Sequence, residues 1–313
     1  MLDERVAMRE VGVSRPRRDA REKLSGQAQY VGDMEMAGML HGAVLRSPHA
    51  HARIVSIDAG AALEMEGVAA VLTGADLNDI EPYYGHAIKD RPIIAIERVR
   101  FAGEPVVAVA AIDEAAAQAA VRAIEVEYEP LPVLGTLDAA LAPDAAPIHT
   151  RRPQMGLFHG LGELGERQGN ICYRHTIAAG DVDMVRSAAE IVVEGDYTFP
   201  AVYQYAMETH ATIAHHHGDS VTLWANCQHP FLVQAEIADL FGLPIGSVRI
   251  VVPYLGGGFG SKSYTKMEPL TVALARKAGR PVRIVNRVDE SMVTSRRHGM
   301  RCWMRTSAAA DGT

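Results

Sequence analysis

The chain has 313 residues, of which 48% are hydrophobic and 22% are charged, and its formal net charge is −7. This composition is typical of a soluble globular protein of roughly two domains, and its acidic balance argues against nucleic-acid binding. No apolar run approaches the roughly 18 residues of a membrane span, and Cys172, Cys227 and Cys302 lack metal-ligand spacing, so we expect no iron–sulfur or zinc site here and a cytoplasmic location.

The first half of the chain predicts an arm followed by a domain rich in strands. Residues 1–22 indicate an extended arm that lacks the apolar core of a signal peptide. Short apolar or alternating runs predict strands over 39–45, 51–57, 68–72, 105–112 and 124–128. Asp113 is placed to cap a helix over 114–123. Residues 133–155 are rich in Pro, Ala and Gly without a sustained period, so we place a linker there, between domains at 23–132 and 156–313.

The second half of the chain mixes helices with strands. Its patterns predict helices after Asp181, from Pro230 to Phe241 and over 266–278, and strands over 191–199, 220–225, 248–252, 282–285 and 301–306. Asp311-Gly312 is a hairpin turn signal at the end of the chain. We therefore expect the partner of the strand at 301–306 to be missing from this chain.

A glycine loop follows the predicted strand at 248–252, and residues 256–262 read Gly-Gly-Gly-Phe-Gly-Ser-Lys. Consecutive glycines allow a left-handed backbone and the close approach of a ligand, and their exposed amides can form an anion-binding concavity. The spacing fits neither the Rossmann fingerprint nor a P-loop. The sequence thus predicts an active-site loop in which Phe259 walls a pocket, with a merely flexible strand-to-helix turn as the alternative.

Two further polar positions are candidates for chemistry. Gln228 lies between a predicted strand and a helix, and its side-chain amide has both donors and an acceptor, which suits the binding of an oxo or hydroxo ligand. A helix N-cap cluster is the alternative for this segment. Glu208 lies among apolar residues, where a buried structural glutamate is favoured over a catalytic acid.

The histidine pairs and runs favour structural interpretations. Adjacent residues of a strand point to opposite faces, so His215, His216 and His217 do not converge on one metal, and we expect an exposed hairpin end. His49 and His51, spaced by two, favour a surface or packing role.

An ordered set of short motifs runs along almost the whole chain. The motifs are Gly26–Asp33, Leu40–Gly42, Arg46–Ala50, Gly67-Val68, Thr73–Leu77, Val99–Val106, Glu127–Pro132, Gly180–Val182, Met207-Glu208, Gln228–Pro230 and Gly256–Lys262. Each is weak alone, but the ordered set is specific. Together they resemble the large, molybdenum-binding subunit of the xanthine dehydrogenase / aldehyde oxidase family of molybdenum hydroxylases.

The resemblance implies an α+β fold, with an α/β-hammerhead domain followed by the first part of a molybdenum-cofactor-binding domain. It implies oxidative hydroxylation of an aldehyde or an N-heterocyclic aromatic, with water as the oxygen source. By motif position, Gln228 hydrogen-bonds the oxo ligand of the molybdenum and Phe259 shapes the substrate slot. Gly257, Gly258, Phe259 and Gly260 lie beside the cofactor. No protein metal ligand is expected, because the pterin dithiolene holds the metal.

The resemblance also implies cofactors and partners. The cofactor is molybdenum–molybdopterin, of which the cytosine dinucleotide form is one candidate, while FAD and 2Fe-2S clusters are expected on an FAD-binding subunit and a 2Fe-2S subunit. Purine-hydroxylating members often carry an acidic residue where this chain has Ser263, which disfavours a purine substrate.

The family's general base is a glutamate in the C-terminal half of the large subunit, which this chain does not reach. We therefore expect the chain alone to be inactive. One hypothesis is a split enzyme, in which that half comes from the same gene or a separate chain. The alternative is a truncated, catalytically silent fragment that acts only as a structural or assembly module. A nucleotide-binding Rossmann protein is a third and weaker hypothesis.

Overall fold

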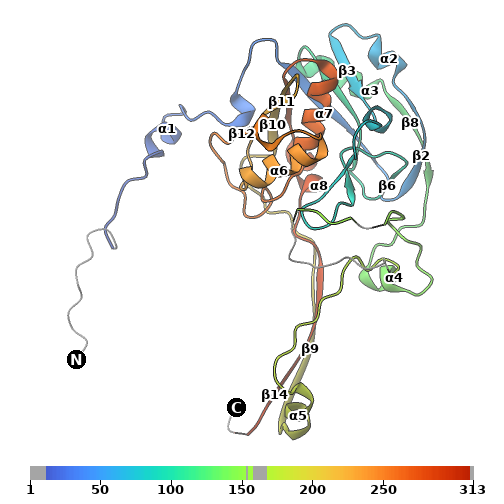
Figure 1. Ribbon diagram of the computed structural model, residues 1–313, viewed down its shortest axis with the longest axis vertical. Coiled ribbons are helices and arrows are strands. Elements are labelled where there is room, and N and C mark those ends of the chain that lie inside the picture. The colour runs from blue at the N-terminus through green and yellow to red at the C-terminus, as the bar shows by residue number, and fades with distance from the viewer. Residues whose placement is uncertain (1–11, 153, 158–167, 311–313) are drawn as a thin grey trace.

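The structure, a computed structural model, describes residues 12–152, 154–157 and 168–310 (Figure 1). The elements of the first region are α1 (Ala20–Leu24), η1 (Val31–Asp33), β1 (Leu40–Arg46), β2 (Ala52–Asp58), α2 (Gly60–Leu63), β3 (Val68–Leu72), η2 (Gly74–Leu77), β4 (Tyr83–Tyr84), β5 (Arg91–Pro92), β6 (Arg98–Val99), β7 (Pro105–Ala111), α3 (Glu114–Arg122), β8 (Glu125–Pro130) and α4 (Leu137–Leu141). Those of the second region are α5 (Val182–Ala188), β9 (Ile191–Phe199), β10 (Ala211–His217), β11 (Ser220–Ala225), α6 (Pro230–Leu240), η4 (Ile245–Ser247), β12 (Val248–Val251), α7 (Glu268–Ala278), β13 (Val282–Val285), α8 (Val288–Thr294) and β14 (Met300–Ala308). This mixture of helices and strands agrees with the predicted α+β class.

A seven-stranded mixed sheet joins the two regions that are separate in sequence. Its order is β12-β11-β10-β13-β1-β7-β3. β1 pairs in parallel with β13, placing Leu40 opposite Val282, and pairs antiparallel with β7 on its other side. Strands of the first region and strands of the second region are therefore joined by backbone hydrogen bonds into one sheet.

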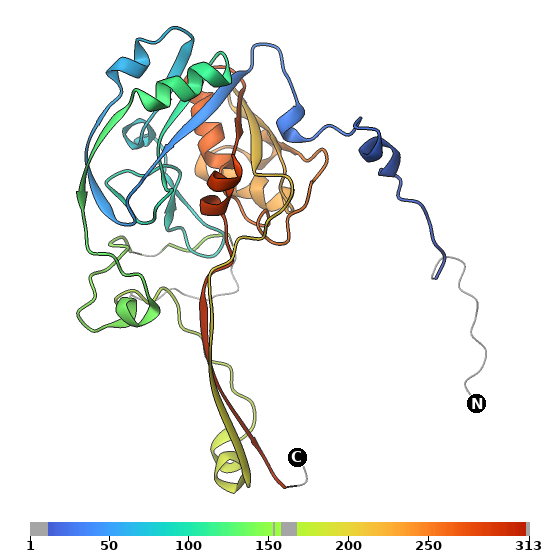
Figure 2. The ribbon, with the colours of Figure 1, turned by 180° about the vertical axis from the view of Figure 1, so that it is seen from behind.

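Helices cover both faces of this sheet (Figure 2). Successive side chains along β7 point alternately into two hydrophobic cores, one on each face. On β7, Val107 and Val109 belong to the core that includes Ala117 of α3. Ala108 and Ala110 belong to the opposite core, which contains residues of α6 and α7. Because both faces are covered, β7 is apolar at nearly every position and lacks the polar alternation of a half-exposed strand.

Most of the predicted elements are present, with ends that agree within about two residues. The Asp113 carboxylate accepts a 2.7 Å hydrogen bond from the Ala116 amide and caps α3, as expected. Gly279 ends α7 in the left-handed conformation, with φ 63°. The sequence missed β10, α4, α8 and the two-residue strands β4, β5 and β6, because these segments are short or lack a clear period. None of the helices in the described residues has the length and hydrophobicity needed to cross a membrane.

β9 and β14 form a two-stranded ribbon that projects from the body, with α5 beside its far end (Figures 1 and 2). The strands pair antiparallel over their full length, from Ile191 opposite Ala308 to Phe199 opposite Met300. The expectation that the strand at 301–306 lacks a partner in this chain is therefore wrong. Its partner comes from the distant segment 191–199, a pairing that no local turn signal reveals. The turn signal at 311–312 lies outside the described residues.

Candidate cofactor and substrate site

The glycine loop, residues 256–263, and Gln228 lie at the same edge of the large sheet. β11 ends at Ala225 shortly before Gln228, and β12 ends at Val251 before the loop. β11 and β12 are parallel neighbours, with Leu223 opposite Ile250. Because the carboxyl ends of parallel strands meet at one edge, the segments that follow them come together, as ligand sites in α/β sheets often do.

The side chain of Gln228 is turned toward the loop. Its Oε1 accepts a 3.1 Å hydrogen bond from the Gly260 amide and a 3.4 Å hydrogen bond from Oγ of Ser263. The backbone N–H of Gln228 donates to the carbonyl oxygen of Lys262 at 2.8 Å. Since Oε1 is the acceptor, Nε2 is the end that remains to donate, and no acceptor among the described residues bonds to it.

The N-cap interpretation of this segment is not supported. α6 begins at Pro230 with His229 at the N-cap position, and His229 makes no side-chain capping hydrogen bond. Gln228 instead connects the segment before α6 to the glycine loop. The side chain of Gln228 therefore contacts the glycine loop and does not cap the helix.

Gly258 lies against the side chain of Gln228. A Cβ at this position would lie 2.4 Å from Oε1 and 2.6 Å from Cδ of Gln228. Gly260 has φ 93°, which side-chain-bearing residues rarely adopt. Contact with Gln228 favours glycine at position 258, and the positive φ favours glycine at position 260. A turn that is merely flexible does not account for these two glycines.

Glu208 and Lys262 form an ion pair beneath the loop. Oε2 of Glu208 accepts hydrogen bonds from Nζ of Lys262 and from the Gly256 amide, each at 2.8 Å. Nζ of Lys262 also donates to the carbonyl oxygen of Glu208 at 2.8 Å. Burial lowers the pKa of the Lys262 ammonium, and the neighbouring carboxylate opposes that shift. The predicted structural role of Glu208 is confirmed, while no pattern in the sequence indicated Lys262 as its partner.

Phe259 occupies the tip of the loop with an unusual backbone. Its φ is 52°, and its side chain is 74% exposed. Within the described residues it therefore faces an open surface rather than a closed pocket. The roles expected of Gln228, Gly257, Gly258, Phe259 and Gly260 toward a cofactor or substrate stay predictions.

His210, which the sequence did not single out, supports the loop from below. Its Nε2 lies 3.2 Å from the carbonyl oxygen of Ser261, and its Nδ1 lies 3.2 Å from Oγ of Ser291. A carbonyl oxygen only accepts, so the proton is on Nε2 and Nδ1 accepts from the serine hydroxyl. Burial lowers the pKa of His210 to about 4, with Lys262, Lys266 and Arg91 adding to the effect.

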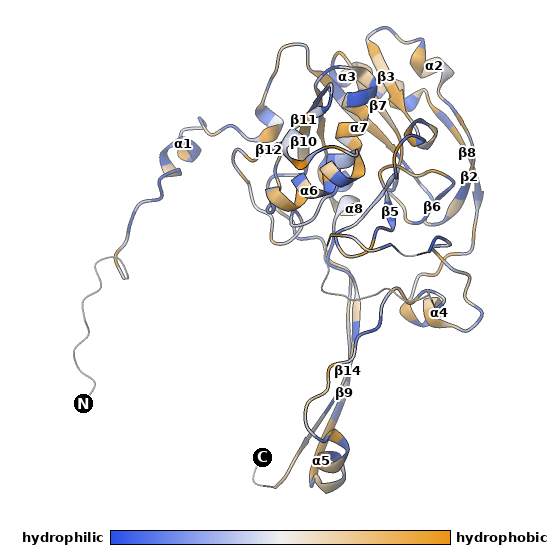
Figure 3. Ribbon diagram, viewed as in Figure 1, coloured by the Kyte–Doolittle hydropathy of each residue, from blue (hydrophilic) through white to orange (hydrophobic). Residues whose placement is uncertain are grey.

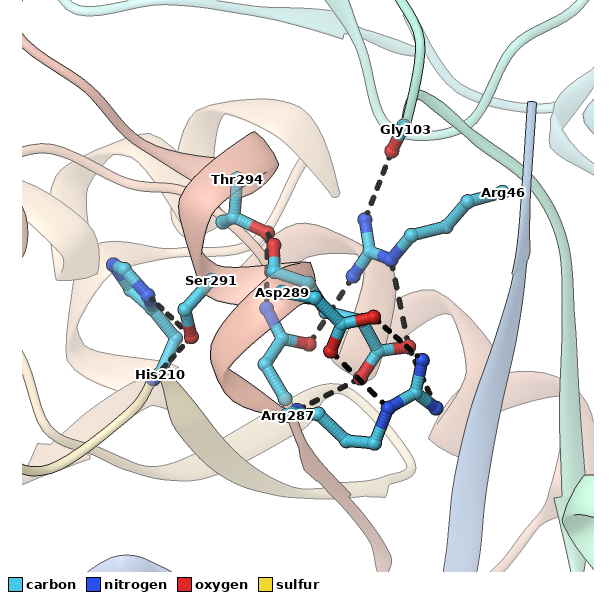
Figure 4. Close-up of polar contacts among 9 residues, drawn as sticks. Arg46, Gly103, His210, Arg287, Asp289, Ser291 and Thr294 are labelled. Atoms are coloured by element: carbon cyan, nitrogen blue, oxygen red, sulfur yellow. Dashed lines mark hydrogen bonds and ion pairs between the residues drawn. The ribbon is translucent and has the colours of Figure 1, made fainter. Parts of the chain in front are cut away.

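The His210 contacts continue to the first region of the chain (Figure 4). The Asn286 amide donates to the carbonyl oxygen of His210 at 2.9 Å, and Oδ1 of Asn286 accepts from Arg46 of β1 at 3.1 Å. Arg46 also donates to the carbonyl oxygen of Gly103 at 3.1 Å. A continuous set of hydrogen bonds therefore links the glycine loop to the first region.

His49, His51 and His217 take structural positions. The His49 ring lies 4.9 Å from the ring of Tyr128, and Nδ1 of His51 donates to the carbonyl oxygen of Pro132 at 2.7 Å, which confirms a packing role. His217 ends β10 before a turn, as a hairpin end requires. The described residues contain no group of three or more His, Cys, Asp or Glu placed to hold a metal ion.

Comparison with known families defines the class of protein. Residues 25–132 match the aldehyde oxidase and xanthine dehydrogenase a/b hammerhead domain, and residues 164–313 match the molybdopterin cofactor-binding domain. The fold and these matches define a hammerhead domain followed by a molybdopterin cofactor-binding domain, as predicted. The chain belongs to the xanthine dehydrogenase / aldehyde oxidase family and corresponds to part of its molybdenum-binding large subunit.

Individual relatives agree with this assignment. The chain is 33% identical over 309 residues to the xanthine dehydrogenase molybdenum-binding subunit of Escherichia coli O157:H7, covering 94% of this chain and 39% of that protein. It is 32% identical over 306 residues to the nicotinate dehydrogenase large molybdopterin subunit of Eubacterium barkeri, covering 96% and 67%. The crystal structure of quinoline 2-oxidoreductase from Pseudomonas putida 86 superposes with a TM-score of 0.81 at 31% identity, covering 96% of this chain and 38% of that chain. The chain thus spans well under half the length of two of these three relatives.

Proposed function

We propose that this chain supplies part of the cofactor and substrate site of a molybdenum hydroxylase that hydroxylates an aldehyde or an N-heterocyclic aromatic. The observation that carries the proposal is the orientation of the Gln228 side chain. Its Oε1 accepts a hydrogen bond from the backbone N–H of Gly260, so its Nε2 remains to donate to a ligand oxygen. When bound, molybdenum–molybdopterin accepts the two electrons released as a substrate C–H bond is replaced by C–OH from water, with loss of two protons.

The residues present fit such a cofactor. Gly258 has no side chain, and one would collide with Gln228, so the loop backbone and the Gln228 amide form one continuous surface. Oε1 of Glu208 is buried and has no hydrogen-bond partner among the described residues, which leaves an acceptor at the same site. We propose that Gln228 and residues 257–260 hold the cofactor's oxygen-bearing side, while Phe259 borders the substrate.

The neighbourhood of Gln228 also bears on the substrate class. Ser263 donates a 3.4 Å hydrogen bond to Oε1 of Gln228 and is half-buried. A serine hydroxyl at this point supplies no carboxylate to bind ring N–H groups. The proposal therefore favours an aldehyde or an N-heterocycle other than a purine.

We further propose that partner polypeptides complete the enzyme. The projecting β9/β14 ribbon and α5 have exposed apolar side chains, including Val193, Trp303, Met304 and Met184. Figure 3 shows α5 with hydrophobic segments beside hydrophilic ones. A two-stranded ribbon is only marginally stable in water without further packing. We assign this surface to the C-terminal half of the large subunit, which would contribute the glutamate base. An FAD-binding subunit and a 2Fe-2S subunit would carry the electrons away.

Purification of the tagged chain with its natural partners tests the proposal. We expect co-purification of a chain carrying the remaining large-subunit sequence, stoichiometric molybdenum and pterin, and turnover of an aldehyde or N-heterocycle. The isolated chain should show no turnover. Appreciable turnover with a full molybdenum content in the isolated chain would contradict the division of the site, and a complete complex without molybdenum would contradict the function. A chain that recruits no partner and no cofactor would favour the silent structural module.

A further inference from the structure

Two aromatic residues share a rare backbone conformation. Tyr205 has φ 51° and Phe259 has φ 52°, and they alone combine a positive φ with a side chain among the described residues. Both are exposed, Tyr205 at 62% and Phe259 at 74%. A bulky residue holds a left-handed conformation only where its surroundings impose it, and such residues cluster at functional sites.

Both residues precede the two partners of the buried ion pair by the same interval. Tyr205 comes three residues before Glu208, and Phe259 comes three residues before Lys262. The Lys262 side chain is 1% exposed and that of Glu208 is 13% exposed. The ion pair therefore joins, below the surface, two segments that each present an exposed aromatic ring above it.

Backbone bonds reinforce this connection. The Glu208 amide donates to the carbonyl oxygen of Gly256 at 3.1 Å, and the Gly256 amide returns a 2.8 Å hydrogen bond to Oε2 of Glu208. With the two bonds from Nζ of Lys262, four hydrogen bonds hold Glu208 against Gly256 and Lys262, at the start and near the end of the loop.

The Phe259 ring lies beside the Tyr205 segment. A Cβ placed on Gly257 would lie 3.2 Å from Cε2 of Phe259 and 3.4 Å from Cβ of Ala206, the residue that follows Tyr205. The Tyr205 ring contacts the ring of the buried Tyr203, at a centroid distance of 5.0 Å and an interplanar angle of 64°. The Phe259 ring and Ala206, the neighbour of Tyr205, thus both lie against Gly257.

We propose that Tyr205 is a second aromatic contact for the substrate beside Phe259, and that the Glu208–Lys262 pair is the positioning element that holds both rings. The substrate contact rests on the proposed function, whereas the positioning role is a property of this chain alone. Because the pair lies below the loop, it acts on the substrate only through the two rings.

Hydrogen exchange of the purified chain tests the positioning role. In Lys262→Met we expect amides in 203–209 and 256–263 to exchange about tenfold faster or more, while amides of β7 and β10 keep their protection. Glu208→Gln should have a smaller effect than Lys262→Met, because an amide oxygen still accepts from the Gly256 amide and from Nζ of Lys262, while the lysine loses its charged partner. Lys277→Met is the matched control, since Lys277 forms a partly exposed pair with Asp76 away from the loop. Unchanged exchange at both segments, or a uniform loss of protection across the sheet, would overturn the positioning role.

Kinetics of the co-purified complex test the substrate contact. Tyr205→Ala should raise KM for quinoline at least about fivefold more than KM for acetaldehyde, with little change in kcat, because only the aromatic substrate loses a stacking partner. Tyr205→Phe should retain the wild-type KM. Equal effects on the two substrates, or no effect, would overturn the contact. A wild-type complex that turns over neither substrate would overturn the proposed function and this contact, while the exchange result would still decide the positioning role.

Discussion

The Gly260 amide donates a 3.1 Å hydrogen bond to Oε1 of Gln228, although the two residues are 32 positions apart. This bond sets the orientation of the Gln228 amide and directs its donors away from the loop. It forms because β11 and β12 are parallel neighbours whose carboxyl ends meet. The geometry at Gln228 therefore depends on the sheet, and it responds to changes in the loop backbone.

A side chain at position 258 should break this relationship. In Gly258→Ala, the new Cβ would lie 2.4 Å from Oε1 of Gln228, so the end of the Gln228 side chain must shift and its hydrogen bond from the Gly260 amide is lost. We expect a loss of about 1–3 kcal/mol in the free energy of unfolding and faster exchange of the Gly260 amide. Denaturant unfolding and hydrogen exchange measure the two effects.

Gly246→Ala is the control for this substitution. A Cβ at Gly246 meets nothing within 4 Å, and its φ is not positive. This variant should leave both quantities within experimental error of the wild type. If Gly258→Ala is equally silent, the close packing of Gln228 on Gly258 does not hold in solution.

His210 should make the stability of the chain depend on pH. Burial lowers its pKa to about 4, below the ordinary value near 6.5, so the unfolded chain binds the proton more tightly. The stabilisation from neutral His210 is fully present above about pH 6.5 and is lost as the pH falls toward 4. Between pH 7 and pH 4 we expect wild type to lose about 3 kcal/mol relative to His210→Asn.

Urea unfolding of both proteins across this range measures the difference. Burial raises the pKa of Glu104, Glu236 and Glu268, so these carboxyl groups oppose the His210 effect. They are common to both proteins and cancel in the comparison. A difference in stability that stays constant with pH would show that His210 is not held neutral.

A charge on the ribbon should separate partner binding from folding. Val193 is the third residue of β9 and is exposed, so Val193→Lys should leave the thermal stability of the isolated chain nearly unchanged. If the C-terminal half of the large subunit covers this surface, the buried lysine should lower co-purification at least about tenfold. Pull-down yield and a thermal melt measure the two properties.

Val55→Lys serves as the control for the ribbon. Val55 is an exposed valine on β2, in the first region of the chain. It should affect neither stability nor co-purification. Equal yields from the Val193 and Val55 variants would exclude the ribbon as the contact surface.

The sequence by itself determined the local elements and the family. The strands at 68–72, 191–199, 220–225 and 282–285 were predicted with the observed ends, because hydrophobic runs bounded by turn residues report directly on burial. The Asp113 cap and the Gly279 stop follow from equally local chemistry. The ordered motifs identified the family without any spatial information.

The tertiary structure alone decided which distant residues meet. The Glu208–Lys262 pair, the His210 contacts and the pairing of β14 with β9 join segments separated by tens of residues or more. The pairing of β1 with β13, which joins both regions into one sheet, is another contact between segments far apart in the sequence. Local propensity sets a helix or a strand, but strand order and the packing of both sheet faces choose its neighbours, and no pattern within a single segment carries that information.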